Sequence, residues 1–500
     1  MKEKISHKGL DHEEMLLFEI GGLNKSGVDF PELQGYEQRI GPSYEDEEIG
    51  IPGLSEPEAV RHYVRLSRKN YSIDAGMYPL GSCTMKHNPR LNEKLARLKG
   101  FSDIHPLQPV STCQGALELI HEISLWLKEL TGMSAIAMSP KAGAQGELCG
   151  MMAIKQALKS KGQESRKKVL IPDSAHGTNP ATAAFLGFEV ITIKSTVAGR
   201  LDLKDFKSKI DKEFAAAMIT NPNTCGLFEK DIIKISEIIH QNGGYLYCDG
   251  ANFNALVGKI KPGDLGIDAM HINLHKTFST PHGGGGPGSG PVVFSDKLAS
   301  FCPAPKIEKI GNKFEIFEDE SNENLLESFG RLNAFHGQMG MYVRALSYML
   351  SHGADGLRQV SEDAVLSANY IKSSLEDVMS LAYEGYCMHE VLFNDDFLKD
   401  TDVETLDFAK ALIDKGYHPM TIYFPLIVHG ALLVEPTETE SKFSIDQFIL
   451  TMKDLVNKTQ SDSDSFKSAP KYTPVRRLDE TKAARELILR WEKETIIAAE

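Results

Sequence analysis

Short apolar segments alternate with helical stretches through the middle of this 500-residue chain. The apolar segments are 169–171, 190–193, 217–219, 245–247, 270–272 and 292–294. Apolar residues recur at helical spacing between 114 and 131, after a capping segment at 111–113 and before Gly132, which is a common helix stop. Strands that are apolar on both faces and separated by helices form a mostly parallel sheet with helices on both sides. The pattern therefore predicts an α/β fold.

The chain divides into three predicted regions. Residues 1–100 are rich in Gly, Pro and charge, and a helix is expected where Ser55 and Glu58 can form a capping box. We interpret this region as an arm that contacts another part of an assembly. Residues 101–335 are predicted to form the large α/β domain, and 336–500 a smaller α+β domain. In that last region we expect a solvated linker at 460–465 and a helix over 480–497.

A lysine and an aspartate each follow a predicted strand. Asp249 ends the segment that starts at Tyr245, and Lys276 comes shortly after the apolar run that ends at Ile272. The spacing between them allows one crossover and one further strand. A lysine amine can bind pyridoxal 5'-phosphate covalently, and an aspartate can keep the pyridine nitrogen protonated so that the ring accepts a carbanion's electrons. The pair therefore predicts a pyridoxal phosphate site.

Further segments at strand ends supply candidate cofactor contacts. Gly143, Ala144 and Gln145 open a predicted helix, whose N–H groups and dipole suit a phosphate. His176 is a candidate to lie flat on the cofactor ring, and Asn223 or Thr224 to reach its phenolic oxygen. The glycines at 283–286 are expected to add backbone donors.

Each of these segments also has a purely structural explanation. The alternatives are a Gly-Ala helix start, a loop histidine with a local hydrogen bond, an Asn-Pro-Asn turn and a flexible glycine hinge. The sequence alone leaves these alternatives open.

Composition and charge narrow the functional class. A formal net charge of −14 argues against nucleic acid or an anionic membrane as partner. The seven cysteines are scattered without metal-ligand spacing, so we expect free thiols, a reducing compartment and no metal site. The first residues show neither a signal peptide nor a transit sequence, and the longest apolar run is too short to span a bilayer. We therefore expect a cytoplasmic enzyme.

Several motifs together resemble one family, that of the glycine cleavage system P protein. Within it, the chain is similar to the cofactor-bearing chain of the two-chain form. The resemblance covers residues from about 60 to the end, and the matching segments are 78–86, 104–110, 141–147, 173–182, 220–229, 249–252, 273–287, 387–390, 423–426 and 435–438.

The resemblance implies a fold-type I, aspartate aminotransferase-like architecture that binds pyridoxal 5'-phosphate. Lys276 matches the family's covalent lysine, Asp249 its pyridine-nitrogen partner and His176 its ring-stacking residue. The implied activity is that of an oxidoreductase, a glycine dehydrogenase (decarboxylating). Such an enzyme removes carbon dioxide from glycine and transfers the aminomethyl group to the oxidised lipoyl arm of H protein. The implied partners are a homologous subunit 1, with two copies of each chain in a heterotetramer, and H protein.

Two other functions stay open. One is a different fold-type I enzyme acting on glycine, such as a hydroxymethyltransferase, although residues 78–82 do not resemble that family. The other is a non-catalytic subunit that has kept the fold. The presence of both Lys276 and Asp249 argues against the latter.

Overall fold

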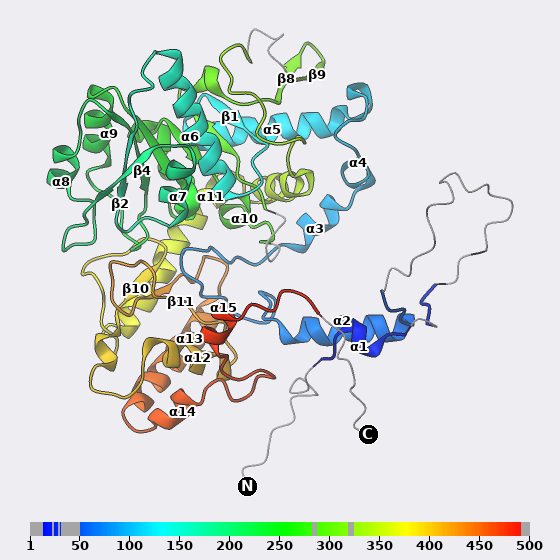
Figure 1. Ribbon diagram of the computed structural model, residues 1–500, viewed down its shortest axis with the longest axis vertical. Coiled ribbons are helices and arrows are strands. Elements are labelled where there is room, and N and C mark those ends of the chain that lie inside the picture. Colours follow the sequence, from blue (N-terminus) through cyan, green and yellow to red (C-terminus); the bar gives the residue numbers. More distant parts are fainter. Residues whose placement is uncertain are drawn as a thin grey trace.

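The computed structural model describes residues 14–22, 25–28, 31, 51–282, 288–318 and 325–491. The middle of the chain (cyan to green in Figure 1) forms an upper body, and the C-terminal part (yellow to red) forms a lower one. The predicted glycine loop at 283–286 lies outside the described residues.

A seven-stranded sheet forms the centre of the upper body, in the order β1-β7-β6-β5-β4-β2-β3. The strands β3, β2, β4, β5 and β6 are parallel to one another, whereas β7 runs antiparallel to both β6 and β1. Their bounds are β1 Ala135–Ala137, β2 Lys168–Pro172, β3 Glu189–Ile193, β4 Phe214–Thr220, β5 Tyr245–Asp249, β6 Ala269–His271 and β7 Val292–Phe294. The mostly parallel sheet predicted from the sequence is confirmed.

Helices cover both faces of this sheet because alternate strand residues point in opposite directions. Leu246 and Cys248 of β5 pack in one apolar cluster with α5, α9 and α11. Tyr245 and Tyr247 pack in the opposite cluster with α6 and α7. The bounds of the helices that follow strands or precede them are α5 Gln114–Thr131, α6 Gly143–Ser160, α7 Thr178–Phe185, α8 Leu203–Ser208, α9 Ile232–Gln241 and α10 Leu274–Thr277. As predicted, α5 stops at Gly132, whose φ of +67° suits glycine.

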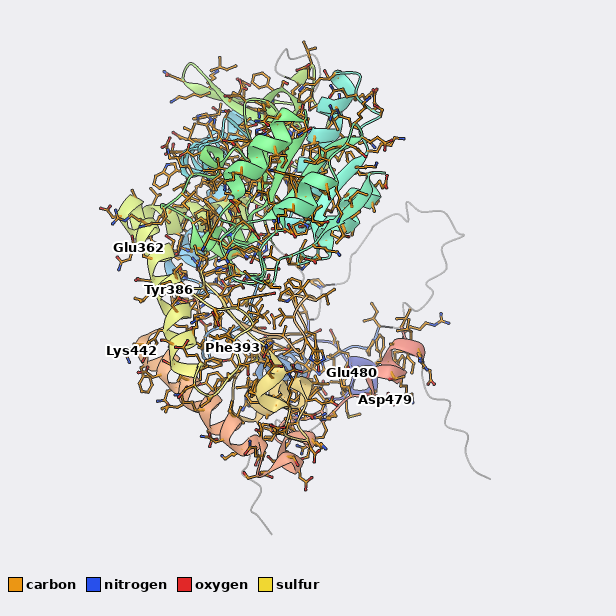
Figure 2. The ribbon with its side chains drawn as sticks, turned by 90° about the vertical axis from the view of Figure 1, so that its left-hand side faces the viewer. Glu362, Tyr386, Phe393, Lys442, Asp479 and Glu480 are labelled. Atoms are coloured by element: carbon orange, nitrogen blue, oxygen red, sulfur yellow. The ribbon has the colours of Figure 1, made fainter. Side chains whose placement is uncertain are left out.

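The lower body has its own sheet and core. Its strands run in the order β10-β12-β11, with bounds Val391–Phe393, Leu432–Val434 and Thr421–Ile422, and both neighbouring pairs are antiparallel. The helices α12 (Thr405–Asp414), α13 (Lys442–Thr459) and α14 (Ser463–Lys467) surround it. Figure 2 shows Lys442 at the start of α13 and Glu362 on the long helix α11 (Met339–Leu375). Since α11 contributes to the cores of both bodies, the domain boundary proposed near 335 falls just before a shared helix.

The N-terminal hundred residues contain α1 (Leu17–Ile20), α2 (Glu56–Lys69), α3 (Arg90–Ala96) and α4 (Lys99–Ser102). The capping box of Ser55 and Glu58 starts α2 as predicted, and α2 extends away from both bodies in Figure 1. Other residues of this region pack against the two bodies, so the region is not a separate arm throughout. Met77 lies in the lower core, and Lys86 is 3% exposed between the two bodies.

Two expectations near the C-terminus are wrong. The predicted linker at 460–465 includes the start of α14, because Phe466 packs into the lower core. Of the predicted helix over 480–497, residues 486–491 are not helical and α15 covers Glu480–Arg485; residues 492–500 lie outside the described part. This helix has no buried residue, so no tertiary packing is available to extend it.

The remaining strands, β8 (Lys306–Ile310) and β9 (Lys313–Phe317), form a hairpin beside α5. All seven cysteines are free, and five of them are buried, as expected for scattered thiols. Within the ranges that the structure describes, none of the helices has both the length and the apolar character of a membrane span.

Candidate functional site

Lys276 lies on the short helix α10, just beyond the carboxyl end of β6. Its Nζ donates a hydrogen bond to the carbonyl oxygen of Ser82 at 2.9 Å. Ser82 has a φ of +64°, a left-handed conformation that side-chain-bearing residues rarely adopt. The lysine amine is therefore hydrogen-bonded to a strained backbone turn of the N-terminal region.

Asp249 ends β5, the parallel neighbour of β6, so it lies at the same edge of the sheet as Lys276. Its Oδ1 accepts a hydrogen bond from the Ala251 N–H at 2.9 Å, and its Oδ2 accepts one from Asn179 Nδ2 at 3.1 Å. His271 Nε2 is 3.4 Å from Oδ1. Burial raises the pKa of Asp249, but His271, these donors and Lys276 outweigh it and hold the pKa below its ordinary value. The structure thus keeps a buried negative charge at this strand end.

A second carboxyl group, Glu147 on α6, lies close to Asp249. The amide of Asn179 bridges them, since its Nδ2 also donates to Glu147 Oε2 at 2.8 Å. Burial, followed by the charge of Asp249, raises the pKa of Glu147 to about 8. Glu147 is therefore neutral at pH 7, and Asp249 carries the negative charge of the pair. In the sequence, Glu147 stood out only as the last residue of the segment 141–147 that resembles the family.

The N-terminus of α6 carries the three residues predicted to cradle a phosphate. Ala142, at the N-cap position, makes no side-chain cap to the first N–H groups of the helix. A Cβ on Gly143 would lie 2.8 Å from Asn273 Nδ2, so only glycine lets the backbone approach this closely. Ala144 follows Gly143 in the first turn. The Gln145 side chain turns back, accepting a hydrogen bond from the Lys141 N–H at 2.8 Å.

His176 follows β2 and is exposed, and its ring is inclined by 64° to that of Phe424 at a ring-centroid distance of 5.8 Å. Its Nδ1 accepts a hydrogen bond from the Thr178 N–H at 3.2 Å. Because His176 is exposed, its ring is available for stacking. Burial lowers the pKa of His271, the neighbour of Asp249, and His176 is among the nearby groups that lower it further.

Asn223 and Thr224, the two candidates for the cofactor's phenolic oxygen, lie in the loop after β4. The Asn223 side chain donates to the Gly199 carbonyl at 2.8 Å and to Glu229 at 2.7 Å, and its oxygen accepts from two backbone N–H groups. The Thr224 hydroxyl donates to the Ser174 carbonyl. Both side chains thus stabilise the loop itself, as the Asn-Pro-Asn turn alternative suggested.

Asn221, two residues earlier, has the free group that Asn223 lacks. It is 3% exposed, and its Nδ2 has no hydrogen-bond partner among the residues that the structure describes. Buried amide donors are normally satisfied, so this one indicates a missing acceptor. Its position directly after β4, where catalytic side chains gather in such sheets, was the sequence signal that could have identified it.

The structure brings further ionisable residues to the same region. Glu390 and Glu435 flank the same end of the paired strands β10 and β12 in the lower body. Burial raises the pKa of each carboxyl group, and the charge of Lys276 opposes that rise. Together with His389 they offer ligand atoms within 4.8 Å of one another, a spacing also seen in metal sites. No metal site was expected from the sequence, in which residues 387–390 stood out only as a segment that resembles the family. Glu435 belongs to the segment 435–438 that resembles the family, but the sequence predicted no role for it.

The segment 82–84 forms another wall near Lys276. Cys83 Sγ is 3.6 Å from His282 Nδ1, and His282 Nε2 is 3.3 Å from the Thr84 carbonyl oxygen. Burial raises the pKa of Cys83 and lowers that of His282 to about 4, so both side chains are neutral at pH 7. Thus the N-terminal region supplies part of the site that the sequence placed in the large domain.

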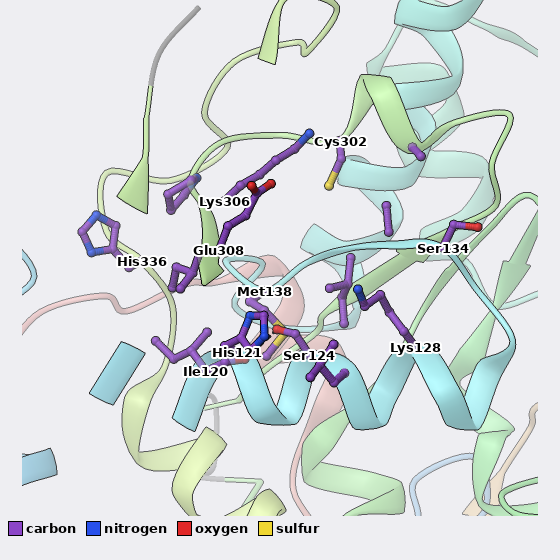
Figure 3. Close-up of a pocket in the computed structure, with 16 residues that line it drawn as sticks. Ile120, His121, Ser124, Lys128, Ser134, Met138, Cys302, Lys306, Glu308 and His336 are labelled. Atoms are coloured by element: carbon purple, nitrogen blue, oxygen red, sulfur yellow. Dashed lines mark hydrogen bonds between the residues drawn. The ribbon is translucent and has the colours of Figure 1, made fainter. Parts of the chain in front are cut away.

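A separate cavity of about 400 Å³ lies between α5, β1 and β8 (Figure 3). His121, Lys128 and Cys302 are among the residues that line it, and it includes none of the candidate residues above. We therefore place the candidate site at Lys276 rather than at this cavity.

Comparison with known proteins gives a consistent result. Residues 360–472 match the family model "Glycine dehydrogenase, C-terminal domain", and residues 145–287 match "Aminotransferase class-V". The chain is 62% identical over 487 residues to a probable glycine dehydrogenase (decarboxylating) subunit 2 from Caulobacter vibrioides, covering 97% of this chain and 93% of that protein. It is 51% identical over 442 residues to the protein of the same name from Thermotoga maritima, covering 88% and 92%.

Among solved structures, the chain resembles a crystal structure of glycine decarboxylase (P-protein) of the glycine cleavage system in inhibitor-bound form. The TM-score is 0.71 at 19% identity, covering 83% of this chain and 93% of that one. A sphingosine-1-phosphate lyase from Burkholderia pseudomallei has a TM-score of 0.61 at 15% identity, covering 86% and 97%. At these identities the likeness concerns the fold, which is the fold-type I architecture expected from the sequence.

Proposed function

The chain belongs to the glycine dehydrogenase (decarboxylating) subunit 2 family, and from this premise we propose that it decarboxylates glycine with pyridoxal 5'-phosphate bound at Lys276. The aminomethyl group is transferred to the oxidised lipoyl arm of H protein. The observation that carries the proposal is the pairing of Lys276 with a buried, charged Asp249 at adjacent ends of parallel strands. Because the lipoyl disulfide accepts two electrons, the enzyme is an oxidoreductase.

The residues present fit the cofactor. Lys276 offers the amine for the covalent bond, and Asp249 holds a proton on the pyridine nitrogen by its negative charge. The uncapped N-terminus of α6 at Gly143, Ala144 and Gln145 offers N–H groups for the phosphate. When bound, pyridoxal phosphate supplies the acceptor for the electron pair that carbon dioxide leaves on glycine.

Asn221 completes this fit. Its unpartnered Nδ2 is the donor we assign to the phenolic oxygen of the cofactor, in place of Asn223 and Thr224. His176 is proposed to stack on the ring, which its exposed position supports.

We propose subunit 1 as the partner, in a heterotetramer with two copies of each chain. The support is the arm helix α2, on which Val60, Tyr63 and Val64 are 50–58% exposed, with Phe18 of α1 46% exposed nearby. Apolar side chains gathered on a projecting helix are typical of an interface. A cytoplasmic location is proposed from the seven free cysteines.

The absorption spectrum of the purified protein, before and after borohydride reduction, tests the cofactor assignment. Reduction should fix the cofactor on the peptide that contains Lys276. Lys276→Ala should lose both the cofactor band and the carbon exchange between glycine and bicarbonate in the presence of subunit 1 and lipoylated H protein. Lys259→Ala, which changes an exposed lysine paired with Glu362, is the matched control and should keep both. Full exchange by Lys276→Ala would refute the proposal.

A further inference from the structure

Glu390 and Glu435 face each other at the end of the small sheet. Val391 of β10 pairs with Val434 of β12 in antiparallel register, so the next residues outward, Glu390 and Glu435, lie on opposite strands at the same level. Both are completely buried, at 0% exposure. Like charges directly opposite each other destabilise a sheet, and burial away from water adds to that cost. Two ionised carboxylates at this position therefore require compensation.

The hydrogen-bond donors around them are neutral. The Ser82 N–H donates to Glu390 Oε2 at 2.7 Å, and the Thr84 hydroxyl donates to Glu435 Oε1 at 2.5 Å. Asn252 Nδ2 lies 3.5 Å from Glu390 Oε1. These donors stabilise a negative charge but do not neutralise it.

The charged groups that face the pair leave one negative charge in excess. Lys86 Nζ is 2.5 Å from Glu438, so those two charges cancel. His389 is neutral because burial lowers its pKa to about 3, and Cys83 is a thiol because burial raises its pKa. Within the described part of the chain, Lys276 is then the cation that remains to balance two carboxylates. One proton on the pair would bring the cluster to neutrality.

We propose that Glu390 and Glu435 share a single proton, and that this pair is the proton store for the reaction at Lys276. The second half of the proposal rests on the proposed function. Proton exchange with the pair needs polar atoms that no other hydrogen bond occupies. Glu435 Oε2 and both ring nitrogens of His389 have no hydrogen-bond partner among the described residues, and His389 Nε2 is 3.8 Å from Glu435 Oε1.

The acidities of the two groups support this role. Burial and the opposite carboxylate raise the pKa of Glu390 well above its ordinary value, and burial raises that of Glu435 to about 7. A group that titrates near the working pH is suited to both accept and donate a proton.

The protons of the reaction balance with such a store. The glycine ammonium must lose one proton before its nitrogen can form a bond, and the pair takes it up, passing from one proton to two. Later the S–S bond of the disulfide breaks, one sulfur forms the bond to carbon, and the other leaves with the electron pair. That thiolate takes one proton from the pair, which returns to its starting state.

Infrared spectroscopy of the cofactor-free protein, with isotope-labelled glutamate, tests the shared proton directly. The wild type should show one protonated glutamic acid at neutral pH that is absent from the double variant Glu390→Gln/Glu435→Gln. Two protonated side chains from the pair, or none, would overturn the proposal. So would one bound metal ion per chain that the double variant loses, since the same side chains have the spacing of metal ligands.

The pH profile of glycine–bicarbonate exchange tests the coupling to the reaction. Glu435→Gln should lose an ionisation near neutral pH and lower the maximal rate at least about 100-fold, the low end for general acid–base groups. Glu440→Gln is the matched control, because burial also raises the pKa of Glu440 but it bonds to Ser444 instead. An unchanged profile in Glu435→Gln would overturn the coupling. Absence of cofactor from Lys276 in the wild type would instead refute the proposed function, and the infrared result is independent of it.

Discussion

The side-chain nitrogen of Lys276 donates a hydrogen bond to the backbone carbonyl of Ser82, 194 residues earlier in the chain. The N–H of the same Ser82 donates to Glu390 in the lower body. One residue of the N-terminal region therefore connects the covalent lysine to the buried acidic pair. This relation makes the site depend on three parts of the chain at once.

Asp249→Ala tests the electron-sink role of that carboxylate. The variant should still bind the cofactor covalently, because Lys276 is unchanged, but the ring nitrogen would lose its proton. We expect glycine–bicarbonate exchange to fall by about 1,000-fold, equivalent to about 4 kcal/mol in the barrier. Asp264→Ala, at an exposed aspartate in the 3-10 helix Pro262–Leu265, is the control and should keep its rate. A near-normal rate for Asp249→Ala would show that another group protonates the ring.

Asn221 and Asn223 should give different results when each is changed to Ala. Asn221→Ala removes an unpartnered donor, so cofactor affinity should fall about tenfold; it also removes the oxygen that accepts a hydrogen bond from the Glu229 N–H, so stability should fall by about 1 kcal/mol. Asn223→Ala removes the bonds to Gly199 and Glu229, so stability should fall by about 2 kcal/mol. Cofactor titration and denaturant unfolding of the cofactor-free proteins measure the two effects. A loss of cofactor affinity in Asn223→Ala but not in Asn221→Ala would show that Asn223 makes the cofactor contact.

Glu147→Gln should change how stability depends on pH. The pKa of Glu147 in the folded protein is raised to about 8, so the folded state binds a proton that the unfolded state releases above its ordinary value of 4.5. Its contribution to stability is thus fully present below 4.5 and is lost as pH rises through 8. Urea unfolding across this window should show a smaller loss of stability in Glu147→Gln than in the wild type. Equal slopes in the two proteins would contradict the raised pKa.

The exposed face of α2 should matter for assembly. Tyr63→Asp and Val64→Asp together place charge on side chains that are 58% and 50% exposed in the single chain. If subunit 1 covers them, association should weaken at least tenfold, because burying an apolar side chain contributes about 1.5–3 kcal/mol. Light scattering on mixtures of the two subunits measures this, with Arg61→Ala on α2 as control. An unchanged heterotetramer in the double variant would remove α2 from the interface.

The sequence anticipated much of the central fold. The strand positions at 169–171, 190–193, 217–219, 245–247, 270–272 and 292–294 all lie in observed strands or at their edge. Apolar runs of this length between helical patterns specify the sheet locally, through burial and spacing. The helix expected over 480–497 failed because its pattern was local, whereas the packing needed to extend it was absent.

Lys276 and Asp249 could be selected from the sequence because strand ends and residue chemistry are both local properties. The contribution of Ser82, Glu390 and Glu435 was decided only by the tertiary structure. Ser82 meets Glu390 across 308 positions, and Thr84 meets Glu435 across 351, so no spacing rule connects them. Chain folding sets these contacts through the two cores and the shared helix α11, and only then do burial and neighbouring charges fix which carboxyl groups carry a proton.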